Sequence, residues 1–272
     1  MTRTFPDRLS CLETLRRVVR DDASLARFGD GECRMAYSDK PLLFQRAAPA
    51  LRERLERALF QPKPGVLACF NHYYHDHLLV DWIARYERYP KPYAFKRSVQ
   101  EPGDVGVLWR PRDMLMYRRY WSRIRRDSRQ PAFGDTSVFY LGCYVDEYRA
   151  GRMDEVLDLF RALFAGRRIL FVGPEDPLGG ASFRDELPRL QRLGLVAGEF
   201  LAIPREDAFD HYDAILAEIR RRDFDDLFLQ AGPTATVMAY ELAGEVRGRV
   251  LDVGSLNTQV RYLEPATAEL AA

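Results

Sequence analysis

The C-terminal half of the chain repeats one pattern, and this pattern restricts the fold more than any other feature. Short apolar runs that end in Gly, Pro or acidic residues alternate with segments of helical periodicity. The runs fall at residues 167–176, 199–207, 226–234 and 249–257. Such alternation is typical of a parallel sheet wrapped by helices. We therefore expect an α/β fold whose sheet is mostly parallel.

Helical and strand patterns also occur around these runs. Residues 49–60 open with a proline and have the spacing of an amphipathic helix, and residues 65–70 form a short apolar run typical of a buried strand. Further helices are expected from a cap near Asp207 and over residues 235–242. Since no linker or repeat interrupts the chain, we expect a single domain over residues 1–272.

Composition narrows the class of protein. The chain has 272 residues, of which 47% are hydrophobic, and its 41 basic and 40 acidic residues give a net charge of +1. This balance provides no overall attraction to nucleic acid or to acidic membranes, so any anion site must be local. The four cysteines form no CxxC pair, and no export signal or membrane span is visible. These features favour a cytoplasmic protein without disulfides.

A pair of carboxylates stands two residues apart between glycines, in the segment RFGDGE at residues 27–32. A compact loop of this kind can direct Asp30 and Glu32 at one hard cation, and Mg²⁺ or Mn²⁺ in proteins typically uses one or two carboxylates plus substrate phosphates. Arg27 could then pair with a phosphate oxygen. The alternative interpretation is a solvated acidic turn.

Two turns between a strand and a helix, at residues 173–183 and 231–237, are suited to bind an anion. Backbone amides and hydroxyl groups at the start of a helix favour phosphate, although ordinary helix capping explains the same residues. The nicotinamide fingerprint and the P-loop are both excluded by glycine spacing. The candidate anion-binding residues are Gly179, Gly180, Ser182, Gly232, Thr234 and Thr236.

Two further segments carry possible functions. His72, His75 and His77 invite a zinc hypothesis, but a polar aromatic surface loop fits them better because no HExxH motif is present. Residues 114–129 form a basic helix with an apolar, aromatic stripe. This helix is either a solvated arginine face or a peripheral membrane contact for an anionic, lipid-linked acceptor.

Taken in order, several of these segments resemble the GT-D-type glycosyltransferase domain family. The resemblance runs through RFGDGE at 27–32, IPREDAFDHYDAIL at 203–216, AGPTATVMAYELA at 231–243 and LDVGSLN at 251–257. It implies a Rossmann-like α/β fold with helices on both faces. It also implies transfer from a nucleotide-sugar donor, a UDP-sugar, to a glycan, glycoprotein or lipid-linked acceptor in bacterial polysaccharide biosynthesis. Mn²⁺ or Mg²⁺ would be held by Asp30 and Glu32.

Sugar transfer from a nucleotide diphosphate sets requirements for the site. Negative charge develops on the leaving phosphate, and a divalent ion stabilises it as a Lewis acid. Arg27, Gly29 and the two glycine-rich turns would contact the phosphates. An inverting path also needs a base, for which Glu175 is the first candidate, followed by Asp135 and Asp252. The rival hypotheses are a phosphohydrolase or nucleotidyltransferase with the same carboxylates, and a non-catalytic nucleotide-sugar binding module.

Overall fold

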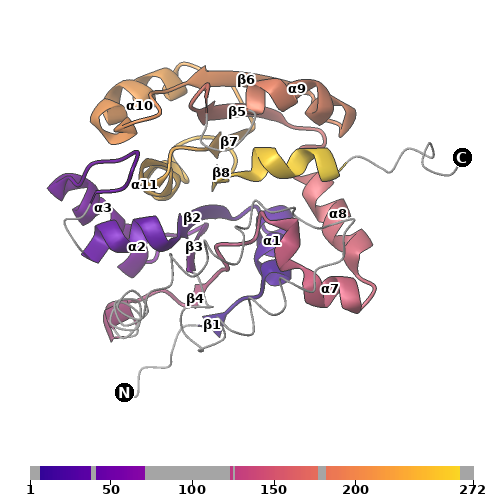
Figure 1. Cartoon of the computed structure of the whole chain (residues 1–272), viewed down its shortest axis with the longest axis horizontal. Helices are drawn as coiled ribbons and strands as arrows, with labels where there is room; N and C mark the ends of the chain where they lie inside the picture. Colours follow the sequence, from indigo (N-terminus) through magenta and orange to yellow (C-terminus); the bar gives the residue numbers. More distant parts are fainter. Residues whose placement is uncertain (1–6, 38–40, 71–122, 125, 177–181, 264–272) are drawn as a thin grey trace, which may run out of the picture.

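The computed structural model describes residues 7–37, 41–70, 123–124, 126–176 and 182–263 (Figure 1). Its centre is a six-stranded sheet in which every pair of neighbours is parallel, in the order β3-β2-β8-β7-β5-β6. The strands are β2 (Ser24–Phe28), β3 (Val66–Phe70), β5 (Arg168–Gly173), β6 (Ala197–Ala202), β7 (Asp226–Leu229) and β8 (Val250–Asp252). The expected parallel sheet is thus confirmed.

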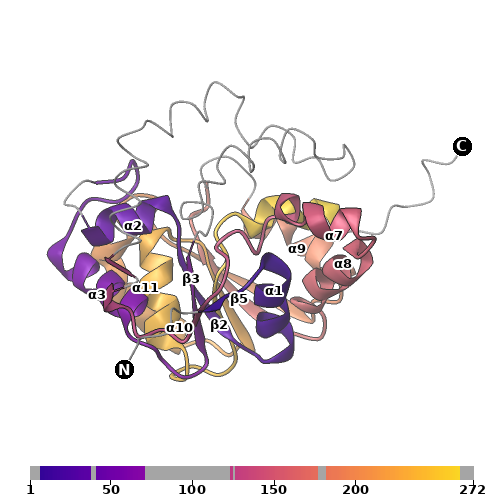
Figure 2. The ribbon, with the colours of Figure 1, turned by 90° about the horizontal axis from the view of Figure 1, so that it is seen from below.

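Helices cover both faces of this sheet (Figure 2). One face carries α2 (Asp30–Tyr37), α3 (Pro49–Phe60), α10 (Tyr212–Arg220) and α11 (Pro233–Leu242). The other carries α1 (Cys11–Arg20), α8 (Met153–Ala162), α9 (Phe183–Arg192) and the 3-10 helix η5 (Leu256–Tyr262). A separate hydrophobic cluster fills the space on each side, as a three-layer α/β fold requires.

Shorter elements complete the described part. A two-stranded parallel ribbon pairs β1 (Asp7–Arg8) with β4 (Ala132–Phe133). Between β4 and β5 lie the 3-10 helix η3 (Leu141–Cys143) and α7 (Val145–Arg149), and η4 (Ala208–His211) precedes α10. Among the described helices, none combines the length and the apolar character needed to cross a membrane.

The buried ion pair between Asp226 and Arg249 lies at the amino ends of β7 and β8. The Arg249 side chain is 1% exposed and that of Asp226 is fully buried. Arg249 Nε donates to Asp226 Oδ1 over 3.1 Å, and Nη1 donates to the Val18 carbonyl oxygen, also over 3.1 Å. The hydrogen bond to Val18, a residue of α1, joins this helix to the sheet. The pairing of Arg249 with Asp226 compensates the two buried charges.

Three helix starts differ from the sequence expectations. The expected cap Asp207 precedes η4 rather than α10, and its carboxylate instead accepts the Arg46 backbone N–H over 2.7 Å. Helix α11 begins at Pro233, so Thr234 lies inside its first turn. Helix α2 begins at Asp30 directly after β2, where a loop was expected.

The parallel strands bring several chain reversals to one edge. At their carboxyl ends, β2 turns at Gly29, β7 turns at Gly232, and β8 turns at Gly254. Ligands of open parallel sheets bind outside the carboxyl ends of the strands, where neighbouring connections leave to opposite faces. In this chain β5 leads to α9 on one face, whereas its neighbour β7 leads to α11 on the other. This edge therefore holds the candidate site.

Candidate functional site at the carboxyl ends of the strands

The carboxylate motif forms the junction between β2 and α2. Asp30 is the first residue of α2, and Glu32 Oε2 accepts the Gly29 backbone N–H over 3.0 Å. Glu32 therefore reaches back over the start of its own helix, as the third residue of a capping box does. The side chain of Asp30 lies outside the described part of the structure.

The motif supplies two carboxylates, the type of ligand that hard cations prefer. Asp30 and Glu32 are the first and third positions of α2, so the motif starts a helix and does not form the expected loop. A carboxylate can accept about four bonds, one of which Glu32 uses for the Gly29 N–H. Mg²⁺ needs only one or two protein carboxylates when phosphate supplies other ligands. Within the described ranges, no three His, Cys, Asp or Glu side chains cluster as a complete protein cage.

Arg27 lies beside this junction, near the end of β2. Its Nε donates to the Thr136 carbonyl oxygen over 2.8 Å, and its guanidinium carbon is 5.7 Å from the centre of the Phe139 ring. Gly254 has φ +51°, and a Cβ atom there would lie 2.4 Å from Arg27 Nη1. The glycine after β8 therefore makes room for the guanidinium group, a role that the sequence analysis missed.

A buried hydrogen-bonded group joins three of the predicted site residues. Thr236 Oγ1, on the first turns of α11, lies 2.8 Å from both the Arg27 carbonyl oxygen and Asp252 Oδ2. Asp252 is 6% exposed at the end of β8. Burial raises the pKa of Asp252, although the Arg27 charge and the Thr236 hydroxyl partly oppose this shift. Since a hydroxyl donates only one hydrogen, a proton on Asp252 would allow both short contacts to be hydrogen bonds.

Gln230 and Asn257 were not predicted as site residues. They contact each other at the carboxyl end of β7, next to β5, where the connections of these two strands leave to opposite faces of the sheet. Gln230 follows β7, and its Nε2 donates to Asn257 Oδ1 over 3.1 Å. Gln230 Oε1 is buried and has no hydrogen-bond partner among the described residues. A Cβ on Gly173, at the end of β5, would lie 3.2 Å from Gln230 Cβ. A single amide side chain between β5 and β7 leaves no motif that sequence reasoning could detect.

The turn before α11 contacts the segment that follows α2. Thr234 is fully buried, and its Oγ1 lies 3.3 Å from Gln45 Oε1. Gly232 has φ +52°, and a Cβ there would lie 2.5 Å from Phe44 Cε2. The Thr234 hydroxyl therefore has a partner within the protein, and Gly232 permits the close approach of Phe44.

The turn before α9 is described only in part. The Ser182 backbone N–H donates to Asp185 Oδ2 over 2.9 Å, and the Ser182 hydroxyl lies 3.1 Å from the same oxygen. Ser182 thus contributes to the cap of α9. Gly179 and Gly180 lie outside the described residues. A phosphate-binding role for this turn stays a prediction.

The two remaining carboxylate candidates have opposite environments. Glu175, two residues after β5, has a side chain that is 61% exposed and pairs with Arg184 over 2.9 Å. Asp135 is 5% exposed; its Oδ1 accepts the Ser137 backbone N–H over 2.7 Å, while its own N–H donates to Thr14 Oγ1. Only Glu175 is therefore open to a substrate hydroxyl, whereas Asp135 shapes a buried turn.

Most of the two aromatic, charged segments cannot be placed. The histidine cluster at residues 71–77 and residues 114–122 and 125 of the basic segment lie outside the described residues. In the described remainder, Arg126 Nε pairs with Asp127 Oδ1 over 2.8 Å. Arg123 pairs with Asp127 over 3.6 Å and with Glu56 over 3.9 Å. These two arginines are thus already paired with carboxylates.

Comparisons with known proteins agree with this architecture. A solved domain of unknown function 1792 matches with a TM-score of 0.65 and 19% identity over 98% of this chain and 83% of that chain. A glycosyltransferase (DUF1792) from Streptococcus sanguinis matches with the same score and identity, over 98% and 86%. No curated protein sequence matches. The model of the family described as glycosyltransferase GT-D fold matches residues 92–264.

The family match and the site overlap only in part. Residues 92–264 include the ends of β5, β7 and β8 but not the carboxylate motif after β2. The likeness to the solved structures supports the fold of nearly the whole chain, and the family match covers well over half of it. This chain is therefore a member of the family of glycosyltransferases with the GT-D fold.

Proposed function

We propose that this glycosyltransferase moves a sugar from a UDP-sugar to a hydroxyl of a glycan or glycoconjugate, at the carboxyl edge of its sheet. The contact of Thr236 with both Arg27 and Asp252 carries this proposal, because it fixes β2, β8 and the start of α11 around one position. The carboxyl ends of parallel strands are suited to bind a diphosphate when a cationic side chain and the N-termini of helices lie beside them. The same elements carry the residues that the family resemblance assigns to the donor.

The donor diphosphate would bind beside the β2–α2 junction. Asp30 and Glu32 would hold Mg²⁺ or Mn²⁺, which when bound offsets negative charge on the leaving phosphate. Arg27 is held by Thr136 through one of its N–H groups, and a guanidinium group has five donors. The others can therefore donate to phosphate oxygens without a rearrangement of the side chain.

Accessibility decides between the candidate bases. A general base must reach the proton that it removes, either directly or through one water. The carboxylate of Glu175 is exposed, whereas Asp252 and Asp135 are buried and hydrogen-bonded within the protein. We assign proton removal from the acceptor hydroxyl to Glu175, and we assign to Asp252 the positioning of Arg27 and Thr236.

Thermal unfolding with UDP tests the donor site without an acceptor. UDP should raise the melting temperature when Mn²⁺ or Mg²⁺ is present and have little effect in EDTA, because the ion links the carboxylates to the diphosphate. Equal stabilisation in EDTA would contradict the metal-linked site. A donor that releases sugar-1-phosphate, rather than UDP and free sugar, would favour the rival phosphohydrolase.

Substitution of Glu175 tests the acceptor side. Glu175→Gln should lower transfer by about 100-fold or more, as loss of a general base typically does, and should leave UDP binding unchanged. Glu206→Gln, a second acidic residue exposed after a strand, is the control and should retain full activity. Wild-type transfer by Glu175→Gln would exclude Glu175 as the base.

A further inference from the structure

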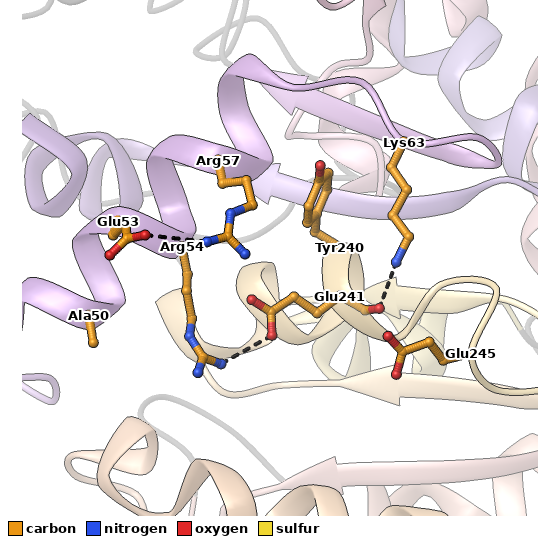
Figure 3. A pocket seen from close by; sticks show the side chains of 8 residues that line it. All are labelled: Ala50, Glu53, Arg54, Arg57, Lys63, Tyr240, Glu241 and Glu245. Carbon is orange, nitrogen blue, oxygen red and sulfur yellow. Dashed lines mark hydrogen bonds and ion pairs between the residues drawn. The ribbon is translucent and has the colours of Figure 1, made fainter.

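A polar pocket of about 680 Å³ lies between α3 and α11, on the flank of the helix layer (Figure 3). Its position differs from that of the carboxyl edge, because it involves the far end of α11. Glu241 lies nine positions after Gly232, which corresponds to about 14 Å along a helix. The lining residues are Ala50, Glu53, Arg54, Arg57, Lys63, Tyr240, Glu241 and Glu245. No part of the proposed donor site belongs to this lining.

All three acidic side chains in the pocket pair with arginines. Glu241 Oε2 pairs with Arg54 Nη1 over 3.1 Å and accepts the Tyr212 hydroxyl over 2.5 Å. Glu245 pairs over 3.3 Å with Arg220, which belongs to α10 and not to the lining. Arg54 is thus paired with the most enclosed carboxylate of the lining, while the pairing of Glu245 uses a cation from outside the pocket.

The other two cations keep donor capacity for a ligand. Lys63 Nζ donates to the Glu241 backbone carbonyl over 2.6 Å, and no carboxylate pairs with it among the described residues. Arg57 makes one bond, over 3.3 Å, to Glu53, whose side chain is 75% exposed. An ammonium has three donors and a guanidinium has five, so both can also bind an oxyanion.

Tyr240 lies on the same wall of the pocket. The residue is 9% exposed, and no hydrogen bond of its hydroxyl occurs among the described residues. Lys63 Nζ lies 5.6 Å from the centre of its ring, and Figure 3 shows Arg57 and Lys63 on either side of Tyr240. A tyrosine hydroxyl without a protein partner keeps one donor for a ligand or for water.

We propose that this pocket is an accessory binding site for a phosphorylated saccharide, separate from the donor site. The phosphate would lie between Lys63 and Arg57 and accept the Tyr240 hydroxyl. The carboxylates of the lining, although paired with arginines, can accept further hydrogen bonds and would do so from sugar hydroxyls. The volume is within the usual range for small-molecule sites. An anionic sugar of this kind matches the acceptor chemistry of a glycosyltransferase, but its binding does not require the proposed donor site.

Calorimetric titration with glucose 6-phosphate tests the proposal, with inorganic phosphate, glucose and glucuronate as separate probes. Wild-type protein should bind glucose 6-phosphate saturably, even in the presence of saturating UDP and Mn²⁺. Lys63→Gln and Arg57→Gln should each weaken binding about tenfold or more, and Tyr240→Phe by a smaller factor. Arg52→Gln, on α3 but outside the pocket, is the matched control and should bind as the wild type does.

Each alternative result overturns a defined part of the proposal. Absence of saturable binding up to about 10 mM, competition by UDP, or equal weakening in Arg52→Gln would exclude the site. Equally tight binding of inorganic phosphate would exclude the saccharide, and tighter binding of glucuronate would replace phosphate with carboxylate. The stabilisation by UDP and Mn²⁺ is measured on the same variants, so failure of the accessory site and failure of the donor site can be distinguished.

Discussion

The two ends of β7 and β8 use buried acidic groups differently. At the amino ends, Asp226 is paired with Arg249, so two charges neutralise each other inside the protein. At the carboxyl end, Asp252 is hydrogen-bonded to the neutral hydroxyl of Thr236, and Arg27 lies nearby with its guanidinium bound to a carbonyl oxygen. In the first arrangement both charges are neutralised within the protein. In the second, Arg27 keeps N–H groups that can donate to a ligand.

This difference separates stability from function along the same strands. A buried, paired charge is costly to disturb because its partner is left uncompensated. A buried carboxyl group with a raised pKa and a neighbouring cation is typical of functional sites. Substitutions at the amino ends should therefore affect folding, and those at the carboxyl ends should affect substrate binding and transfer.

The largest effect is expected at the amino ends. Asp226→Asn should lower the free energy of unfolding by about 3–5 kcal/mol, because Arg249 would remain buried with only the Asp22 carboxylate, 4.0 Å away, as a counter-charge. Chemical denaturation measures this change. Asp223→Asn, which removes an exposed partner of Arg168, is the control and should have little effect. If Asp226→Asn is as stable as the wild type, the ion pair is not the structural anchor of this end.

The next effect concerns Glu32, which is proposed both to cap α2 and to bind the ion. Glu32→Gln should leave stability nearly unchanged, since an amide oxygen can also accept the Gly29 N–H. Transfer should fall by roughly 100-fold, or about 3 kcal/mol, and Asp30→Asn should behave alike. Steady-state kinetics and thermal unfolding measure the two properties.

Helix α1 provides the matched control for this substitution. Glu13 accepts the Ser10 backbone N–H over 2.8 Å, so it has the same capping role far from any proposed ion. Glu13→Gln should therefore retain both stability and transfer. Near-normal transfer by Glu32→Gln would restrict Glu32 to its capping role.

A smaller effect is expected for the hydroxyl that joins α11 to β8. Thr236→Val should lower the free energy of unfolding by about 1–3 kcal/mol, because it removes a hydrogen bond from a buried carboxyl group. Thr234→Val, two residues earlier in α11, removes a contact with the neutral Gln45 and should cost less. Equal losses in the two variants would mean that the buried carboxyl group of Asp252 adds nothing to the strength of this hydrogen bond.

The smallest effect is a pH dependence at Asp252. Its pKa is raised on folding, so the stability from the protonated form is present below the unfolded pKa and is lost as pH rises through the folded pKa. Asp252→Asn cannot titrate, so the stability of the wild type relative to this variant should fall as pH rises above the usual range of an aspartate. Denaturation at several pH values measures the difference. A relative stability that rises with pH would instead indicate a lowered pKa.

Sequence patterns predicted the layers of the fold but not the position of each strand. The apolar runs at β5, β7 and β8 were identified because buried parallel strands are continuously hydrophobic. Their order was not predictable, because the pairing of β8 with β2 depends on tertiary contacts that leave no local pattern. The start of α2 was missed because Gly29 and Gly31 have low helix propensity, which favoured a loop.

The candidate site was likewise only partly visible in the sequence. Residue type and turn position singled out Arg27, Thr236 and Asp252, and the structure brings these three together. The space for Arg27 depends on Gly254, whose importance comes from a positive φ and a close approach that only coordinates reveal. The choice of a candidate base also depends on environment. Glu175 and Asp252 both lie at the carboxyl end of a strand, but only the side chain of Glu175 is exposed.

The position of β8 in the sheet determines how late in synthesis the sheet can be completed. β8 is the last of the six strands along the sequence, yet it lies between β2 and β7. Until its residues have left the ribosome, β2 and β3 lack their neighbour and Arg27 lacks the glycine that makes room for it. Contacts between residues so far apart also form slowly. The proposed sugar-transfer site can therefore form only after β8 has been synthesised, and a nascent chain that stops before β8 carries the carboxylate motif without its neighbours at the carboxyl ends of the strands.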